Sequence, residues 1–323
     1  MAQLQRSLSE RPLVSTPGAC PCCNSNASRV VLKECEDLLH GTGGRWSLIE
    51  CRNCGLIRTD PMPADDQIAA LYPSAYGPHH RGKKLTGVRG VGAILRRIAI
   101  SPYQLRFGAP GIACHPFGAG RFLDVGCGAG TLLRKMVDAG WVGTGLDISD
   151  SALAEARASV PEASFFAGTV ESAALTGPYE LITMQHVLEH VPRPMDCLRR
   201  CFDLLSPGGI LLIALPNFQS AEARLLGRHW VGLDVPRHLL HFREPVIMNL
   251  LQSCGYEVAR RRPQMFASSI SESLLLLLPA NVRGKVIRSP LARALYLSLV
   301  FPACISYFLG NRGAVEIHAR KPV

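Results

Sequence analysis

The sequence predicts an α/β fold with a doubly wound sheet, and three observations predict it. Short apolar segments alternate with amphipathic helical segments from residue 121 onward. A glycine-rich turn, Gly126-Cys-Gly128-Ala-Gly130, follows the first apolar segment, and Asp147 ends the second, nineteen residues after Gly128. In a parallel sheet this order places a glycine loop and an acid at one edge, where nucleotides bind.

Composition narrows the class of protein. The 323 residues are 47% hydrophobic and 19% charged, which excludes a disordered or collagen-like chain. No uninterrupted apolar run reaches the roughly 18 residues of a membrane span, and the first 15 residues lack the apolar centre of a secretory signal. The twelve cysteines therefore indicate a reduced, cytoplasmic protein that uses some thiols as metal ligands.

The N-terminal part predicts a metal site. We expect residues 1–18 to be flexible and residues 19–60 to form a zinc ribbon, because two C-x-x-C pairs lie about 27 residues apart. The four ligands would be Cys20, Cys23, Cys51 and Cys54. A closed four-sulfur site leaves no position for water, so a structural role is expected, and a cluster of metal-free thiols remains the alternative.

Residues 61–118 predict a helical linker or lid. Apolar residues at helical spacing between positions 85 and 98 are interleaved with arginines. Such a basic amphipathic helix covers its own core, binds a partner or lies on a membrane. Eight basic and no acidic residues lie between positions 67 and 121, so much of the net charge of +10 belongs to this flank. This basic surface suits anionic substrates, lipid headgroups or nucleic acid.

The core is expected over residues 119–267. Apolar segments at 121–125, 141–147, 163–168, 179–184, 209–217 and 256–262 predict six strands with helices between them, and a final strand lies in residues 312–323. A hydrophobic helical insertion, residues 268–311, precedes that last strand. Its apolar runs are interrupted by Arg293 and Pro302, so they pack on the core, in a homodimer interface or against a bilayer.

The glycine turn decides between two cofactors. A dinucleotide fingerprint requires G-x-G-x-x-G, whereas this turn reads D-x-G-x-G-x-G, with Asp124 two residues before Gly126. Asp124 suits recognition of a methionine ammonium group. With LDVGCGAG, GLDIS, HVLEHVPRP, LSPGGILLIALPN and AVEIHARK in this order, the sequence from about Arg121 to Lys321 resembles the class I S-adenosylmethionine-dependent methyltransferases.

The resemblance implies a Rossmann-like sheet of seven strands and a set of cofactor contacts. Glycines would shape the cofactor loop, Asp147 would hold the ribose, and the remaining residues would lie against adenine, beside the cofactor or in a closing segment. The predicted cofactor-binding residues are Tyr76, Asp124, Gly126, Gly128, Gly130, Asp147, Ile148, Thr169, Val170 and Gln185. One departure is that Thr169 follows the third strand, where many relatives carry an acid.

His186-Val-Leu-Glu189-His190 is the candidate catalytic motif. The spacing places three polar side chains on one face of a helical turn, at the carboxyl end of the fourth strand. Methyl transfer needs alignment and, for some acceptors, proton removal, and histidine suits the latter near neutral pH. We predict that His186 and His190 act as base or orient the acceptor, with Glu189 as orienting partner. A purely structural turn is the alternative.

A second metal is a further hypothesis. Certain relatives, the ubiquinone-pathway O-methyltransferases and small-RNA terminal 2′-O-methyltransferases, hold a divalent metal with E-x-x-E-H and a later histidine. Here His186 replaces the first glutamate. The metal ligands would then be His186, Glu189 and His190, together with His238 or His241.

These features predict an S-adenosylmethionine-dependent methyltransferase. The acceptor would be an oxygen or carbon of a sugar, a lipid-linked compound or a secondary metabolite, and the enzyme would be cytoplasmic with peripheral contact to the inner face of the membrane. A zinc-ribbon RNA methyltransferase is the main alternative, although Met184-Gln185-His186 lacks the [DNS]-P-P-[FYW] turn of many amino-directed nucleic-acid enzymes. A non-catalytic cofactor-binding scaffold is the third.

Overall fold

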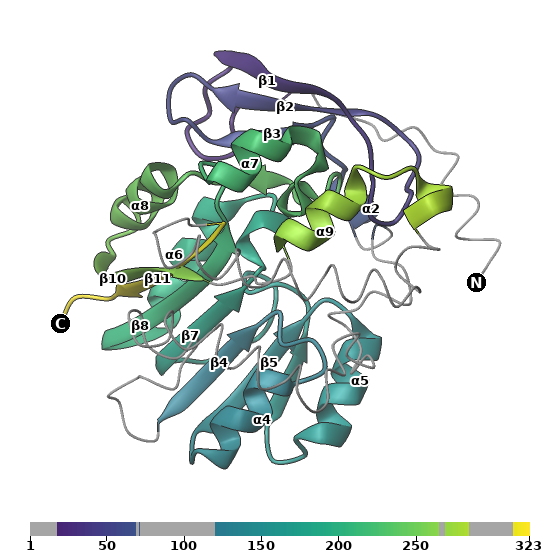
Figure 1. The fold of residues 1–323 in the computed structure, drawn as a ribbon. Coiled ribbons are helices and arrows are strands. Elements are labelled where there is room, and N and C mark those ends of the chain that lie inside the picture. The colour runs from purple at the N-terminus through teal and green to yellow at the C-terminus, as the bar shows by residue number, and fades with distance from the viewer. Residues whose placement is uncertain (1–17, 69–70, 72–119, 265–268, 284–312) are drawn as a thin grey trace.

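A computed structural model describes residues 18–68, 71, 120–264, 269–283 and 313–323 (Figure 1). Tyr76, the basic helix expected over 85–98 and most of the insertion before the last strand lie outside the described residues. No helix within the described ranges is long and apolar enough to span a membrane.

The main sheet has seven strands, which confirms the predicted fold class. The first three strands along the chain are β4 (Arg121–Val125), β5 (Val142–Asp147) and β6 (Ser164–Ala167). They are followed by β7 (Tyr179–Gln185), β8 (Leu205–Pro216), β10 (Glu257–Gln264) and β11 (Ala314–Arg320). The order across the sheet is β10-β11-β8-β7-β4-β5-β6, with β11 antiparallel to both neighbours and the strands from β8 to β6 parallel.

Helices cover both faces of this sheet, because its strands are apolar on both sides. Phe122 packs in one core cluster with Leu133 of α4 (Thr131–Asp138). Leu123, the next residue, packs in the other cluster with Leu198 of α6 (Pro194–Leu204) and Ile247 of α8 (Glu244–Ser253). Alternate residues of a strand point to opposite faces, so two cores result. Helix α5 (Asp150–Ser159) connects β5 to β6.

The N-terminal module forms a second, four-stranded antiparallel sheet. Its strands are β1 (Ser28–Cys35), β2 (Trp46–Cys51), β3 (Ile57–Asp60) and β9 (Leu240–His241). The sequence did not predict β9, which comes from the core segment and pairs Ile57 with His241. Trp46 and Ile57 share a core cluster with Trp230 and Leu233, so the module is packed onto the core.

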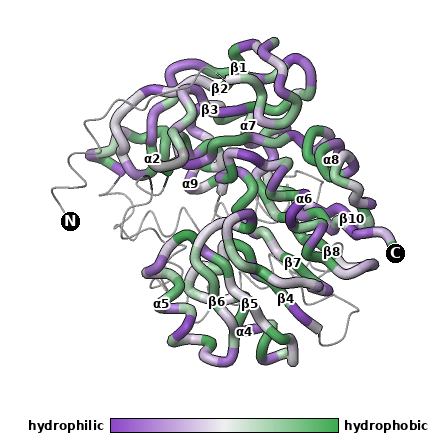
Figure 2. The backbone as a smooth tube through the Cα atoms, turned by 180° about the vertical axis from the view of Figure 1, so that it is seen from behind, coloured by the Kyte–Doolittle hydropathy of each residue, from purple (hydrophilic) through white to green (hydrophobic). Residues whose placement is uncertain are grey.

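The remaining elements are short and connect the two sheets. They are α2 (Asp65–Ile68), α7 (Ala221–Leu226), α9 (Ser269–Leu276) and the single turns η4 (Leu188–His190), η5 (Gly227–His229) and η6 (Val231–Leu233). In Figures 1 and 2 the N-terminal sheet lies at one end of the molecule, next to α7 and α9, whereas α4 lies at the other end. The histidine turn η4 contacts both β8 and β9, so it lies where the two sheets meet.

Candidate active site

A cavity of about 760 Å³ opens where β4, β5 and β7 end. In the strand order, β4 lies between β5 and β7, which is the point where an open α/β sheet reverses direction and binds its ligands. The walls include the loops after these strands, several residues between 230 and 238, and Leu39 and His40 of the N-terminal module. Parts of α9 and the start of β11 also line the cavity. Its volume lies within the range of about 300–1,000 Å³ found for ligand sites.

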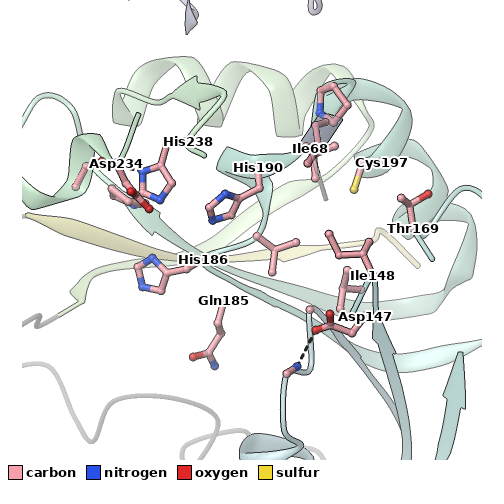
Figure 3. A pocket seen from close by; sticks show the side chains of 18 of the residues that line it. Ile68, Asp147, Ile148, Thr169, Gln185, His186, His190, Cys197, Asp234 and His238 are labelled. Atoms are coloured by element: carbon pink, nitrogen blue, oxygen red, sulfur yellow. Dashed lines mark hydrogen bonds between the residues drawn. The ribbon is translucent and has the colours of Figure 1, made fainter. Parts of the chain in front are cut away.

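Asp147 organises one end of the cavity. Its Oδ2 accepts a hydrogen bond from the amide of Gly128 at 2.9 Å, and its Oδ1 accepts one from the amide of Ser149 at 2.9 Å. Each carboxylate oxygen has a second lone pair, so Asp147 can still accept two hydroxyl hydrogen bonds. Figure 3 shows Asp147 with Ile148 and Thr169 at this end of the cavity, away from the histidines.

Gly126 has to be a glycine. Its φ is +72°, and a Cβ there would lie 2.4 Å from Cγ2 of Val187. The backbone of the loop can therefore lie close to a ligand. Gly128 also lines the cavity, whereas Gly130 precedes α4 with φ +76° and faces Ala156. This cradle fits the end of a nucleoside whose ribose meets Asp147.

Four further predicted cofactor residues line the cavity: Ile148, Thr169, Val170 and Gln185. Ile148 is 47% exposed, so part of its apolar surface is available to a ligand in the cavity. The hydroxyl of Thr169 donates to Oγ of Ser172 at 3.2 Å, so it closes a local turn. Their contacts with adenine remain predictions.

Asp124 lies behind the loop. It is not among the described residues that line the cavity, and its Oδ1 accepts the hydroxyl hydrogen of Thr183 at 2.6 Å. Burial, together with the charge of Asp147, raises the pKa of Asp124 to about 7 against the hydrogen bond from Thr183. The role of Asp124 in binding the methionine ammonium group of the cofactor stays a prediction.

The histidine motif differs from the predicted helical turn. The turn η4 begins at Leu188, and His186 precedes it with φ +55°, so the three residues do not share one helical face. The ring of His186 instead lies between Gln264, whose Oε1 is 3.1 Å from Nε2, and Glu189, whose Oε1 is 3.3 Å from Nδ1. His186 and His190 line the cavity, and Glu189 is buried behind them.

His190 and His238 form a pair at the end of the cavity away from Asp147. Their ring centroids are 4.7 Å apart and nearly perpendicular (Figure 3). Nδ1 of His190 is 2.9 Å from the carbonyl oxygen of Arg237, and Nδ1 of His238 is 2.9 Å from that of Gly232. Because a carbonyl only accepts, both Nδ1 atoms donate, and in the neutral form of such a ring the lone pair lies on Nε2. Burial, with the neighbouring His238, lowers the pKa of His190 to about 4, so this ring is neutral at pH 7.

Glu189 is a buried carboxylate with a deficit of hydrogen bonds. It is 1% exposed, and neither oxygen has a hydrogen-bond partner among the described residues. Burial acts to raise the pKa of Glu189. The contact with His186 outweighs burial and lowers the pKa to about 2, so the side chain is ionised. A buried charge of this kind is costly unless a cation compensates it.

Three of these residues could hold that cation. The ligand atoms of Glu189, His190 and His238 lie within 4.8 Å of one another. Metal-bound histidines usually donate the other ring nitrogen to a carbonyl, as His190 and His238 do here. His186 does not belong to this group, and His241 lies next to Thr59, with Nε2 3.1 Å from Oγ1. Of the two later histidines considered from the sequence, His238 is the one brought to Glu189.

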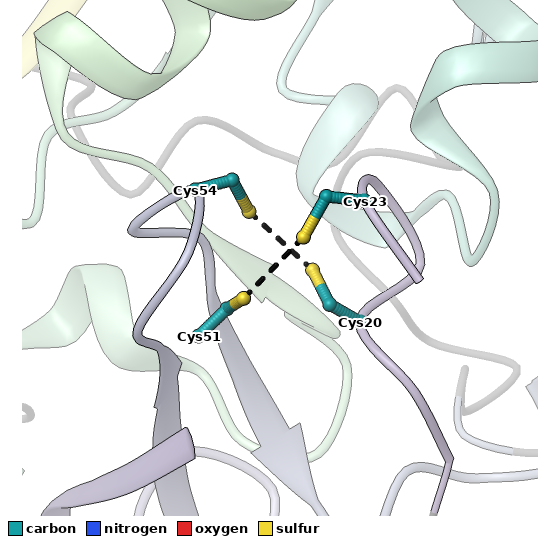
Figure 4. Close-up of side chains that lie close together, drawn as sticks. All are labelled: Cys20, Cys23, Cys51 and Cys54. Carbon is teal, nitrogen blue, oxygen red and sulfur yellow. Dashed lines mark hydrogen bonds between the residues drawn. The ribbon is translucent and has the colours of Figure 1, made fainter. Parts of the chain in front are cut away.

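The four predicted zinc ligands converge (Figure 4). Sγ of Cys20 is 3.5 Å from Sγ of Cys54, the same distance separates Cys23 from Cys51, and all four sulfurs lie within 4.8 Å of one another. Sulfurs at about 2.3 Å from a tetrahedral zinc ion stand about 3.8 Å apart. The donor set and its spacing are thus compatible with zinc, which these four residues would hold as a closed structural site.

A family model described as a methyltransferase domain matches residues 96–260, about half of the chain. The chain belongs to the class I S-adenosylmethionine-dependent methyltransferases. This methyltransferase is 30% identical over 154 residues to a ubiquinone biosynthesis O-methyltransferase of Xanthomonas campestris, covering 45% of this chain and 63% of that protein. It is 37% identical over 101 residues to a protein of the same name from Nitrosospira multiformis, covering 29% and 42%.

The match thus spans less than two thirds of these curated relatives. Among solved structures, a methyltransferase of Methanosarcina mazei described as S-adenosylmethionine-dependent is 18% identical, with a TM-score of 0.46 and coverage of 67% of this chain and 98% of that one. The glycine loop and Asp147 lie within the residues that the family model matches. The family model does not account for the four-cysteine module, which lies outside residues 96–260.

Proposed function

We propose that this methyltransferase transfers a methyl group from S-adenosylmethionine to a hydroxyl oxygen of a small-molecule acceptor. The observation that carries the proposal is His190, a neutral histidine that lines the cavity and keeps its lone pair on Nε2 because Nδ1 donates to Arg237. The names of the curated relatives, O-methyltransferases of ubiquinone biosynthesis, support oxygen as the target.

The two ends of the cavity bind different ligands. Gly126, Gly128 and Asp147 form the end that binds the nucleoside, and His190 with His238 forms the end that meets the acceptor. When bound, S-adenosylmethionine supplies a methyl carbon already activated by its sulfonium. The chain aligns the acceptor oxygen with that carbon, in line with the breaking carbon–sulfur bond. As the new carbon–oxygen bond forms, Nε2 of His190 accepts the hydroxyl proton.

A divalent cation at the same place is a second candidate for activating the acceptor. Glu189, His190 and His238 would hold it, since Glu189 is an ionised, buried carboxylate without a hydrogen bond among the described residues. Such an ion lowers the pKa of a bound hydroxyl group. Metal analysis of the full chain decides the matter. Two metal ions per chain, one of which is lost in His238→Ala, support the cation, and one zinc ion in both proteins excludes it.

The function is tested with methyl-tritiated S-adenosylmethionine and a cell extract divided into lipid, RNA and small-molecule fractions. We expect label in the small-molecule or lipid fraction, and we expect hydriodic acid to release it as methyl iodide, because that reagent cleaves O-methyl but not C-methyl groups. His190→Gln should lose transfer and still bind S-adenosylhomocysteine. Label in the RNA fraction would favour the RNA methyltransferase, and label in no fraction with intact cofactor binding would favour the scaffold.

A further inference from the structure

The N-terminal module contributes residues to the cavity that the methyltransferase family does not account for. Leu39 and His40 line the cavity, as do Trp230 and Val231 of the core. Leu39 is 39% exposed and lines the cavity, so part of its apolar surface is available to a ligand. Both residues belong to the turn between β1 and β2.

Asp37 shapes that turn. Its carboxylate accepts hydrogen bonds from the amides of Leu39 at 3.1 Å, His40 at 2.9 Å and Thr42 at 3.0 Å. Three backbone bonds to one side chain fix the direction of the turn, and thereby where Leu39 and His40 point.

The same carboxylate holds Arg237 of the core. Nη1 and Nη2 of Arg237 donate to Asp37 at 2.9 and 2.7 Å, and Nε donates to Asp234 at 2.9 Å. The Arg237 and Asp37 side chains are 0% and 1% exposed. A buried, bidentate ion pair fixes both the orientation and the distance of the Arg237 and Asp37 side chains. Simple attachment of the N-terminal module to the core would not require such a defined geometry.

Arg237 in turn fixes the histidine pair. Its carbonyl accepts the Nδ1 hydrogen bond of His190, and the carbonyl of Asp234 accepts the amide of His238 at 2.9 Å. The hydroxyl of Thr59, in β3, donates to the carbonyl of His238 at 2.7 Å. Both rings are therefore positioned by backbone that the N-terminal module holds.

We propose that the turn of residues 37–42 is part of the acceptor site, in which Asp37 positions His190 and His238 through Arg237, and Leu39 and His40 contact the acceptor. The inference rests on the proposed function and deepens it. Leu39, Trp230 and Val231 form an apolar wall, so the acceptor carries an apolar portion besides its reacting hydroxyl. The four-cysteine module is then required for acceptor chemistry and not for binding the methyl donor.

The test compares Asp37→Asn with Glu36→Gln in the full chain. Glu36 is the adjacent carboxylate, but it is exposed and lies 3.4 Å from Arg45 on the surface. A second control, Glu50→Gln, weakens another ion pair between module and core, Glu50 with Arg243, which is partly exposed. If docking alone mattered, Glu50→Gln and Asp37→Asn would have similar effects.

Three measurements are made on each variant. For Asp37→Asn we expect unchanged zinc content and unchanged affinity for S-adenosylhomocysteine by calorimetry. We expect amide hydrogen exchange to become at least about tenfold faster at His190, Val191 and His238, without change in β7 and β8. With the acceptor fraction, kcat should fall by about 100-fold while KM for the donor is unchanged. Asp37→Glu should restore part of kcat, because it keeps the charge.

Two outcomes would overturn the inference. One is unchanged exchange at these three amides in Asp37→Asn, and the other is an equal loss in Glu50→Gln. If Asp37→Asn loses its zinc, Arg237→Lys replaces it, because lysine keeps the charge without the bidentate geometry. If the native chain transfers no methyl group, the proposed function fails, whereas the exchange pattern still decides whether Asp37 positions the histidines.

The apolar wall is tested separately. Leu39→Asp should raise KM for the acceptor and leave the binding of S-adenosylhomocysteine unchanged. Val30→Asp is the matched control, because Val30 is likewise an exposed apolar residue of the module, at 49%, and is not among the residues that line the cavity. Equal KM values for both variants would show that Leu39 does not meet the acceptor.

Discussion

Asp124 makes the stability of the ligand-free protein depend on pH. Its carboxyl is fully buried, and burial raises its pKa from 3.8 to about 7. Because the folded pKa exceeds the unfolded one, the folded chain binds more protons between these two values. The stabilising contribution of Asp124 is therefore fully present below about pH 4 and is lost as the pH rises through about 7.

The size of the effect follows from the two pKa values. A difference of about 3 pH units corresponds to about 4 kcal/mol between the protonation states, at about 1.4 kcal/mol per unit. More than half of this falls between pH 5 and 7.5, where the linkage relation gives a loss of about 2.5 kcal/mol. Other groups also titrate there. His190, whose folded pKa is lowered to about 4, contributes stability that is lost as the pH falls from about 6.5.

The contribution is isolated by comparison with Asp124→Asn, which keeps an acceptor oxygen for the hydroxyl of Thr183 but cannot ionise. The free energy of unfolding in urea is measured for both proteins at pH 5 and pH 7.5. We expect the native protein to lose about 2.5 kcal/mol more than the variant between these pH values. Asp138→Asn, on the surface beside Arg134, should behave as the native protein. If the free energy of unfolding changes equally with pH in the native protein and in Asp124→Asn, Asp124 does not have the raised pKa.

Three further predictions concern single positions. Gly126→Ala should weaken S-adenosylhomocysteine binding at least about 30-fold by calorimetry, because φ is +72° and Val187 blocks the new Cβ. Gly227→Ala is the control and should not weaken binding, because Gly227 also has a positive φ, +51°, but has open space around it. Cys23→Ser should lose zinc in metal analysis, and Cys22→Ser, outside the four-sulfur group, should keep it. As the pH falls from 6.5 to 4, the free energy of unfolding should decrease more for the native protein than for His190→Gln. Equal decreases in the two proteins would contradict the lowered pKa of His190.

The main sheet and the metal module were predictable because their signals are local. Apolar segments that alternate with helices predict a doubly wound sheet, since each strand is buried on both faces. Residues such as Cys20 and Cys23 predict that the four cysteines converge, because a short spacing fixes their distance. Asp147 could be predicted because it follows a strand at a set interval from the glycine loop.

The acceptor side was less predictable because its contacts join distant residues. Asp37 and Arg237 are 200 positions apart, and neither shows a local pattern that would reveal their ion pair. Strand β9 consists of two residues, too few for a periodic signal. His186 fits helical spacing in sequence but adopts φ +55°, because β7 extends to Gln185 and the chain turns sharply before η4. The contact between His190 and His238 could therefore be recognised only in the tertiary structure.

The most direct test of the account is calorimetric titration of the native chain with S-adenosylhomocysteine, alongside a nicotinamide dinucleotide. We expect one molecule of S-adenosylhomocysteine per chain and no heat with the dinucleotide. Asp147→Ala should weaken binding by at least about 10-fold, because losing even one hydrogen bond to a charged group costs about 1.5–3 kcal/mol. Binding of the dinucleotide in place of S-adenosylhomocysteine would contradict the assignment of this cavity.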